Sequence, residues 1–401
     1  MKRRCKNIDI TSPEVVKPWV TDCLLRHRKR YDFRKLFLDF GMSKDDYNEA
    51  IHNHDKSKFM PYIDLIAIEA CRQIKERNLK MTPVRIREQK DHTTMKVRLI
   101  GCECAMQQVF DYIAVYSCSD IWRCRLVPQQ ASSVPKRGQV YGMKMLKKYV
   151  NDDNRAIRYA KKHYLNYASK CKYVTKLDIR KCYPSARLEI FMGLFRRDCG
   201  NKDVLWLWET LLMSHRVNDY QGFMIGSLIS QWGCQYMLSF AYREMMSLHY
   251  FKRGVAYKSI SHAVLFMDDM TLFGSNRTQL YKAVKYMIRY IKDALGFDIK
   301  PNYAIHKLGQ IDMMGYVIYR KGTVSIRSRN YIKAIRLKKR YERNGTLSVR
   351  QAKRFVSYKG FFKHSDFNKA GVFDIFRSAQ EIISKKEKKN DDGESTVQRA
   401  A

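Results

Sequence analysis

The chain has 401 residues, and 45% of them are hydrophobic, which is enough for a sizeable core and excludes a disordered protein. Lys and Arg total 77 against 39 Asp and Glu, a formal net charge of +38. In a compact fold these positively charged side chains repel one another. The excess therefore predicts a polyanionic partner, with nucleic acid as the first candidate. The basic residues are spread along the chain rather than gathered on one amphipathic helix, which argues against a membrane surface as that partner.

The sequence also gives no sign of membrane insertion or export. No apolar run reaches the roughly 18 residues that span a bilayer, and no apolar signal core follows the basic first residues. We therefore expect a cytoplasmic protein with no membrane partner. Its 11 cysteines are then expected to be reduced thiols.

Helical patterns dominate the first 170 residues. Apolar residues recur at helical spacing over 62–74 and over 106–115. The Lys/Arg-rich stretch 80–100 between them is expected to be extended. Residues 128–142 contain two Pro, two Gly and two Ser, which predicts a loop.

The middle of the chain changes to alternating and short apolar runs. Residues 173–179 alternate and predict a strand with Asp178 on the face opposite Leu177. Residues 263–273 predict a hairpin with two carboxylates at its tip. Helical patterns fill 188–215, 228–251 and 279–295. This order predicts an α+β fold, an antiparallel sheet with helices on one face.

Three carboxylates stand out at these strand ends: Asp178, Asp268 and Asp269. An Asp-Asp pair is common in turns, because Asp favours turn conformations. Here, however, apolar strands flank the pair, and carboxylates beside buried strands cost free energy unless a cation or hydrogen bonds compensate them. Phosphoryl transfer uses two divalent ions roughly 3.5–4 Å apart, and Mg2+ prefers carboxylate oxygens. The three residues are therefore candidate metal ligands.

From residue 325 the chain returns to a basic helical pattern. An aromatic cluster follows, formed by Phe355, Tyr358, Phe361 and Phe362. Such rings could stack on bases, but they more often form the core of a small domain, and we favour the core. The charged tail from 384 has no apolar pattern and is expected to be disordered.

Three motifs carry a family resemblance. Residues 177–185, LDIRKCYPS, resemble the first palm motif of reverse transcriptases, and residues 266–269, FMDD, resemble their aromatic-x-Asp-Asp motif. Between them, QGFMIGSLISQ at 221–231 resembles the motif that contacts template and incoming nucleotide. KVRLI at 96–100, GFDIKPN at 296–302 and IDMMGY at 311–316 resemble a fingers strand, the next palm motif and the primer-grip turn. The resemblance covers about 96–340.

The resemblance implies a right-hand polymerase fold with fingers, palm and helical thumb. An N-terminal extension and fingers would occupy 1–165, the palm with finger insertions 166–323, the thumb 324–383 and a disordered tail 384–401. It also implies RNA-directed DNA synthesis, a nucleotidyl transfer that uses two Mg2+ ions, or Mn2+ in their place, held by Asp178, Asp268 and Asp269. The partners would be template RNA, DNA primer and product, and deoxynucleoside triphosphates.

Further site residues are implied by the same motifs. A ring at Tyr183 would collide with a ribose 2′-hydroxyl and so select deoxynucleotides. Lys300 would neutralise pyrophosphate, with Lys307 as its rival. The remaining nucleotide contacts would be Arg98, Ile179, Ile225, Gly226, Ser230 and Gln231, and the primer grip would be Met314, Gly315 and Tyr316.

One motif narrows the resemblance. IGSLISQ at 225–231 looks like the reverse transcriptases of diversity-generating retroelements, which copy a template RNA with errors at adenines and work with a small basic accessory protein. The sequence departs from that type in Phe266, in Met267 and in its long basic N-terminal region. Three alternatives stay open: a bacterial phage-defence reverse transcriptase, a non-catalytic RNA-binding scaffold, and a template-independent nucleotide-adding enzyme.

Overall fold

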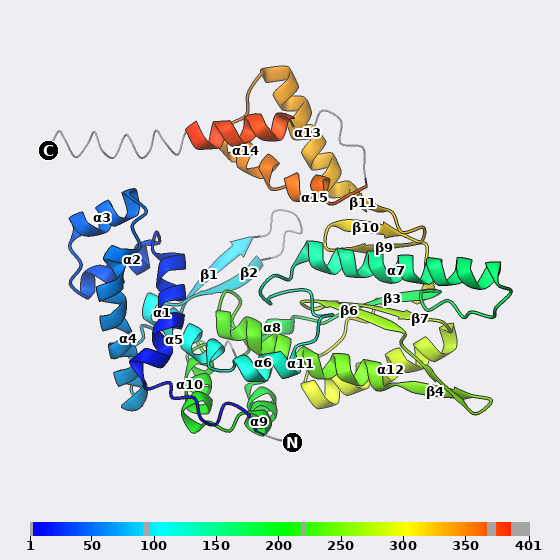
Figure 1. Ribbon diagram of the computed structural model, residues 1–401, viewed down its shortest axis with the longest axis horizontal. Coiled ribbons are helices and arrows are strands. Elements are labelled where there is room, and N and C mark those ends of the chain that lie inside the picture. The colour runs from blue at the N-terminus through cyan, green and yellow to red at the C-terminus, as the bar shows by residue number, and fades with distance from the viewer. Residues whose placement is uncertain (1–2, 91–96, 218–220, 367–373, 386–401) are drawn as a thin grey trace.

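The structure is a computed structural model that describes residues 3–90, 97–217, 221–366 and 374–385. Helices from the N-terminal third, a mixed helix-and-sheet part and a small helical unit form three regions, at the left, right and top of Figure 1. The fold is therefore mixed helix and sheet, as predicted.

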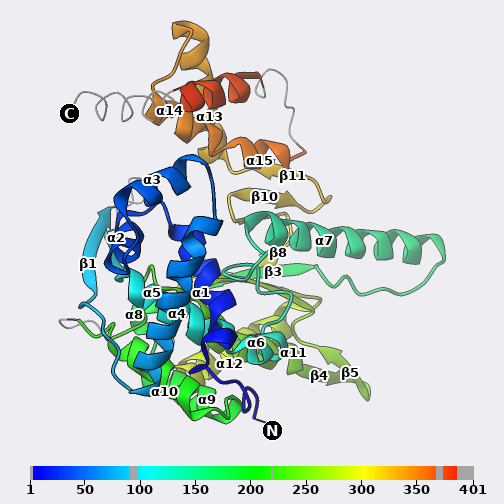
Figure 2. The ribbon, with the colours of Figure 1, turned by 60° about the vertical axis from the view of Figure 1, so that its left-hand side comes forward.

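The N-terminal third begins with helices that pack against α5, and Figure 2 shows α1 and α4 standing beside it. One continuous core joins these helices to the middle of the chain, from Ile10 to Phe297. The expected extended stretch forms an antiparallel hairpin, β1–β2. The elements are α1 (Pro13–His27), α2 (Tyr31–Asp39), α3 (Lys44–His52), the 3-10 turn η1 (Ser57–Phe59), α4 (Met60–Lys75), β1 (Arg85–Lys90), β2 (Val97–Cys102), α5 (Ala105–Tyr116), α6 (Ser119–Arg125) and α7 (Gln139–Lys162).

A four-stranded antiparallel sheet lies at the centre of the right-hand region. Its strands, in spatial order, are β6 (His262–Phe266), β7 (Asp269–Gly274), β3 (Tyr173–Asp178) and β8 (His306–Lys307). The predicted hairpin is thus β6–β7, closed by a two-residue turn at Met267 and Asp268. The predicted loop before this region is shorter than expected, because α7 already begins at Gln139.

Helices cover both faces of this sheet, so the prediction of helices on one face is wrong. α11 (Leu228–Ser247) and α12 (Arg277–Leu295) pack against β6 and β7 on one face. On the other face, Leu146 and Val150 of α7 share a core cluster with Val264. The inner residues of β6 and β7 are buried on both sides, and a strand that is apolar on both faces needs cover on both.

The helix expected over 228–251 ends at Ser247, and the chain then forms a β-hairpin. Its turn residues Arg253 and Gly254 both have positive φ, 50° and 76°, which matches the right-handed twist of a two-residue hairpin. The elements around it are α8 (Cys182–Ser185), α9 (Leu188–Asp198), α10 (Lys202–Met213), β4 (His249–Lys252) and β5 (Val255–Lys258).

The last region has its own small core. Phe355 and Phe362 are fully buried in it, which confirms that these two rings form core and are not open stacking platforms. The small core is built on α13 (Ser328–Asn344), α14 (Val349–Val356), α15 (Lys359–Lys363) and residues 374–385, which are also helical. The strands before it are β9 (Gln310–Met313), β10 (Tyr316–Tyr319) and β11 (Val324–Ile326), and the buried residues of β9 and β10 belong to the core cluster that includes α7 and Val264. The predicted disordered tail lies outside the described residues from 386 onward.

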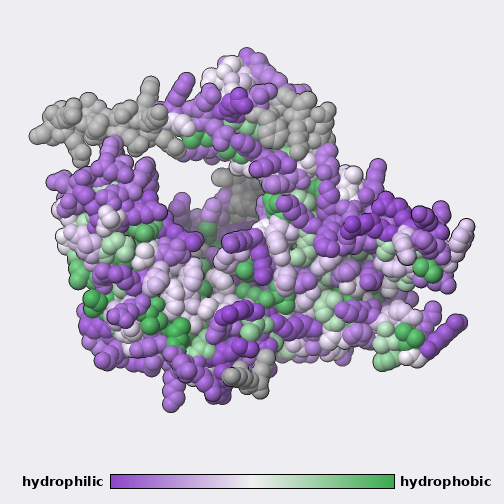
Figure 3. Space-filling model, in the orientation of Figure 1, coloured by the Kyte–Doolittle hydropathy of each residue, from purple (hydrophilic) through white to green (hydrophobic). Residues whose placement is uncertain are grey.

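The surface agrees with the composition. Figure 3 shows a mostly hydrophilic face with a hollow between the helices α13–α15 and the rest of the molecule. Within the described ranges, no helix combines the length and the apolar character needed to cross a bilayer.

Candidate active site

The structure brings the three candidate carboxylates to one end of the sheet. β3 ends at Asp178 and β7 begins at Asp269, and the two residues are directly paired across the strands, so their side chains share one face. Asp268 lies in the turn before β7, where its carbonyl accepts a hydrogen bond from the Ile179 amide at 3.1 Å. The turn residue Met267 has φ 53°, a conformation that costs roughly 1–3 kcal/mol in a non-glycine residue.

The surroundings of these acids disfavour negative charge. Burial raises the pKa of Asp268 above its usual value, and the nearby Asp178 carboxylate adds to the rise. Burial also raises the pKa of Asp269, with repulsion from Asp268 as the next cause. The fold therefore concentrates carboxylates where a cation would relieve their repulsion.

A cation of the protein already contacts this group. The Lys300 ammonium lies 2.6 Å from Asp178 Oδ1 and 2.7 Å from Oδ2, and the Lys300 amide donates to the Asp178 carbonyl at 2.9 Å. Lys307, the rival candidate, pairs with Tyr173 at the opposite end of β3, roughly 17 Å away at 3.4 Å per residue. Of the two lysines, only Lys300 can act at these carboxylates.

The chemistry of the three acids suits a divalent ion, although the three side chains do not converge on one point. Carboxylate oxygens are the ligands that Mg2+ prefers, and the raised pKa values of Asp268 and Asp269 favour a bound cation. In the described part of the chain, no three His, Cys, Asp or Glu side chains converge closely enough to hold a metal ion. The counter-ion of Asp178 is Lys300.

The loop at 221–226 packs closely on the segment after β3. The Phe223 amide donates to the Tyr183 carbonyl at 2.8 Å. A Cβ on Gly222 would lie 2.2 Å from the Pro184 carbonyl oxygen, so only glycine permits this approach. Tyr183 is half-buried at this contact, on the segment that follows Asp178.

The β1–β2 hairpin meets the same loop from the other side. The Gly101 amide donates to the Ile225 carbonyl at 2.8 Å. Gly226 has φ +109°, and a Cβ there would lie 2.9 Å from the Gly101 oxygen. Arg98 is exposed on β2, and its charge is among those that lower the pKa of Asp268. The charge of Arg98 therefore acts on Asp268, and Ile225 and Gly226 contact the strand that carries Arg98.

Ser230 is not available for the predicted nucleotide contact. It is 0% exposed, its hydroxyl accepts a hydrogen bond from the Met224 amide at 3.1 Å, and it lies 3.4 Å from His215 Nδ1. The α11 helix turns this side chain into the core. Its neighbour Gln231 is half-buried on the first turn of the helix, and Ile179 is fully buried.

A buried polar network behind Ser230 escaped the sequence analysis. His215 Nε2 lies 2.9 Å from a Glu103 carboxylate oxygen, and both side chains are almost fully buried. Asp111 is also fully buried, and it accepts hydrogen bonds from the Ser227 hydroxyl at 3.1 Å and from the Ile229 amide at 3.3 Å. No spacing in the sequence signals this network, because its members come from three separate segments.

The predicted primer-grip residues form a tight turn between β9 and β10. Met314 and Gly315 have φ of 56° and 82°, as a two-residue hairpin turn with two left-handed positions requires. A Cβ on Gly315 would lie 2.4 Å from a ring carbon of Phe361 on α15. Tyr316 is buried beneath the turn. The last helical region therefore packs against this turn through Phe361.

Comparison with known proteins follows this geometry. Residues 89–318 match the family model described as reverse transcriptase (RNA-dependent DNA polymerase). Because the match spans more than half of the chain, the protein belongs to the reverse transcriptase family. RNA-templated DNA synthesis by nucleotidyl transfer is the activity of that family.

No curated protein matches the sequence. Telomerase from Candida albicans, in complex with a fragment of telomeric RNA, is similar at 11% identity and a TM-score of 0.43, over 86% of this chain and 67% of that one. Apo telomerase from Candida tropicalis, truncated from its C-terminal domain, is similar at 12% identity and a TM-score of 0.39, over 76% of this chain and 78% of that one.

Proposed function

We propose that this protein copies RNA into DNA by nucleotidyl transfer at Asp178, Asp268 and Asp269. The observation that carries the proposal is the pairing of Asp178 with Asp269 beside the turn that presents Asp268. These acids would hold two divalent ions, which when bound activate the primer hydroxyl and neutralise the triphosphate. The β1–β2 hairpin, the sheet and the helices α13–α15 would act as fingers, palm and thumb.

The chain's own residues have roles that follow from their positions. Arg98 would hold triphosphate oxygens through its planar guanidinium. Lys300 would leave Asp178 when ions bind and turn its ammonium to the departing pyrophosphate. Tyr183 would exclude the 2′-hydroxyl of ribonucleotides, and Gly226 would let the backbone approach the new base pair.

The experiment compares wild-type protein with Asp268→Asn in primer extension on an RNA template. The substitution keeps the size of the side chain and removes its charge. We expect synthesis to fall at least about a thousandfold, the loss of roughly 4 kcal/mol of transition-state stabilisation, with RNA binding and folding intact. Extension at the wild-type rate would show that the metal-site assignment is wrong. A wild-type protein that binds RNA without extending the primer would instead favour the non-catalytic scaffold.

We further propose error-prone copying of a template RNA, as in diversity-generating retroelements. The form of residues 225–231, apolar-Gly-x-x-x-Ser-Gln, favours this role, and a small basic accessory protein would then be a partner. Expression with the native flanking DNA and sequencing of the complementary DNA test it. Errors concentrated opposite template adenines support the proposal. Faithful or repetitive products point to a phage-defence enzyme, and products made without RNA point to template-independent addition.

A further inference from the structure

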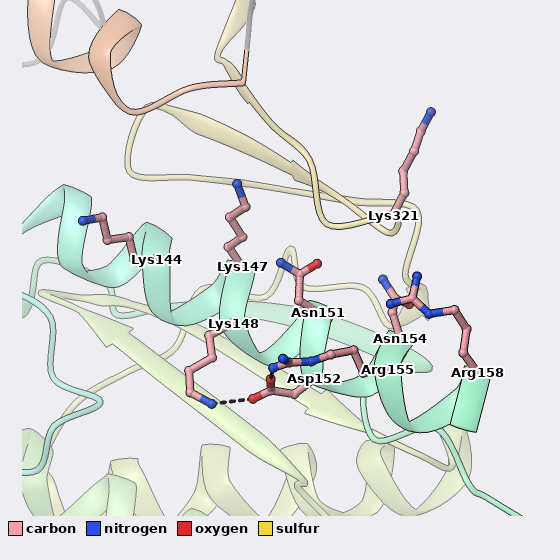
Figure 4. A pocket seen from close by; sticks show the side chains of 9 residues that line it. All are labelled: Lys144, Lys147, Lys148, Asn151, Asp152, Asn154, Arg155, Arg158 and Lys321. Carbon is pink, nitrogen blue, oxygen red and sulfur yellow. Dashed lines mark hydrogen bonds and ion pairs between the residues drawn. The ribbon is translucent and has the colours of Figure 1, made fainter. Parts of the chain in front are cut away.

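A strongly basic groove runs along α7, apart from the candidate active site. Lys144, Lys148, Arg155 and Arg158 recur at helical spacing and share the outer side of the helix (Figure 4). At 1.5 Å per residue the row extends over roughly 21 Å. Lys321, from the turn between β10 and β11, forms the opposite wall, and the groove has a volume of about 470 Å³.

The groove holds more positive charge than the protein neutralises. Asp152 is its one acidic lining residue, and it pairs with Lys148 at 2.5 Å and also with Arg155. Lys147 pairs with Asp366 at 2.9 Å. The other three cations are Lys144, Arg158 and Lys321. In the part of the chain that the structure describes, no carboxylate lies within ion-pair distance of them.

The turn that carries Lys321 is held firmly against α7. The Asn154 amide donates to the Arg320 carbonyl at 2.8 Å, and the Arg320 guanidinium pairs with the buried Asp153 carboxylate at 2.9 Å. Gly322 has φ +88°, and a Cβ there would lie 1.7 Å from Asn151 Oδ1. Lys321 is therefore presented to the helix from a fixed backbone, as in a preformed binding site.

We propose that this groove, the α7 groove, binds the phosphate backbone of a double-helical nucleic acid. A straight row of cations over roughly 21 Å exceeds one nucleotide and fits the regular phosphates of a duplex. Proteins that bind single strands add aromatic rings for base stacking, and the lining of this groove contains none. α7 runs from the middle of the molecule to its edge (Figure 1), so the α7 groove leads away from the hollow under α13–α15.

The test measures binding without synthesis, so it succeeds or fails independently of the proposed polymerase activity. The full-length protein is first loaded with one equivalent of a short unlabelled primer–template hybrid to occupy the candidate active site, because an excess of this double helix would also fill the α7 groove. A labelled 20-base-pair RNA duplex, a DNA duplex of the same sequence and a single RNA strand are then titrated at several salt concentrations. The groove variant is K144Q/R158Q/K321Q. The control K44Q/K56Q/K202Q removes three exposed charges elsewhere.

We expect a second duplex to bind the loaded wild-type protein and the loaded control alike. The groove variant should bind it at least roughly tenfold more weakly, with a salt slope smaller by about two to three, since each lost phosphate contact removes about 0.9. If the RNA duplex binds more tightly than the DNA duplex, the natural ligand of the α7 groove is RNA. If the two bind equally, the groove recognises only the phosphate backbone. Three results would overturn the proposal: equal losses in both variants, no second duplex on wild type, or single-strand binding as tight as duplex binding.

Discussion

At the scale of single residues, the candidate site is a group of acids whose charges the fold does not fully compensate. Burial and mutual repulsion raise the pKa values of Asp268 and Asp269, whereas Asp178 has Lys300 as its counter-ion. A carboxylate with a raised pKa takes up its proton at a higher pH than an ordinary Asp. Protons and divalent cations therefore compete for the same oxygens.

This competition predicts how activity depends on pH. At a low Mg2+ concentration, the primer-extension rate should fall as the pH decreases towards the raised pKa values, well before the ordinary Asp value of 3.8 is reached. A tenfold increase in Mg2+ should move the acid limb of the profile to lower pH by up to about one unit, because each ion displaces protons. The measurement is kcat/KM for a deoxynucleotide against pH at two Mg2+ concentrations. If the pH of the acid limb is the same at both Mg2+ concentrations, the assignment of these carboxylates as metal ligands is contradicted.

The sequence predicts some of these residues better than others. Asp178, Asp268 and Asp269 were singled out because apolar runs flank them, and the structure places the three acids together at one end of the sheet. The choice between Lys300 and Lys307 could not be made, because it depends on how β8 pairs with β3. The burial of Ser230 likewise depends on how α11 is rotated against its neighbours, which one sequence does not reveal.

At the scale of elements, the loop before α11 is positioned by buried polar groups rather than by apolar packing alone. Asp111 of α5 accepts hydrogen bonds from Ser227, the N-cap of α11, and from Ile229 in its first turn. Burial raises the pKa of Asp111 well above its usual value, and the Glu103 charge adds to the rise. Asp111 therefore links the first turn of α11 to the helix that follows the β1–β2 hairpin.

Two substitutions of Asp111 should separate its hydrogen bonds from its charge. Asp111→Ala leaves the Ser227 hydroxyl and the Ile229 amide without their acceptor, and should lower the free energy of unfolding by about 1–3 kcal/mol per group. Asp111→Asn keeps an acceptor oxygen and should cost less. Because the folded-state pKa is raised, wild type is stabilised below the ordinary value of 3.8 and loses that stability as the pH rises towards the folded pKa.

Asn cannot ionise, so the unfolding free energy of Asp111→Asn should fall less than that of wild type as the pH rises from the ordinary Asp value of 3.8 towards the raised folded pKa. Urea titrations of the three proteins at several pH values measure this difference. Equal losses for Asn and Ala, or parallel pH profiles for Asn and wild type, would show that Asp111 does not act through its buried carboxyl. Gly193→Ala, at an open position within α9, serves as a control that should leave the profile unchanged.

Element boundaries show the same limit of prediction. β3, the β6–β7 hairpin and α12 were expected within a few residues of their observed ends, because their patterns are long or strongly alternating. The end of α11 was missed because residues 248–251 remain apolar and aromatic after the helix stops. The Gly254 turn is the local signal that could have found it, since a hairpin needs such left-handed positions.

At the scale of the whole molecule, the described residues form three hydrophobic cores, one large and two smaller. The large core joins the N-terminal helices to the sheet without a break, so those helices are part of the same body as the candidate site. The helices α13–α15 have a separate core and meet the rest partly through one aromatic contact. The Phe361 ring lies 5.1 Å from the Tyr316 ring, centroid to centroid, and the Tyr316 hydroxyl donates to the Gly360 carbonyl at 3.3 Å.

This contact predicts a separation between chemistry and retention of the product. Phe361→Ala removes the ring that packs on the Gly315 turn and should weaken the junction by about 2 kcal/mol, less than a fully buried Phe because the ring is half-buried. If α13–α15 close over the primer–template duplex, the variant should add a single nucleotide at nearly the wild-type rate but release its product several-fold sooner. Single-turnover addition and product length under a competitor trap measure the two quantities. Phe251→Ala, at a ring that is 75% exposed on β4, is the control and should change neither. Equal losses in addition rate and product length would mean that the turn positions the reacting ends rather than coupling the last helices to the sheet.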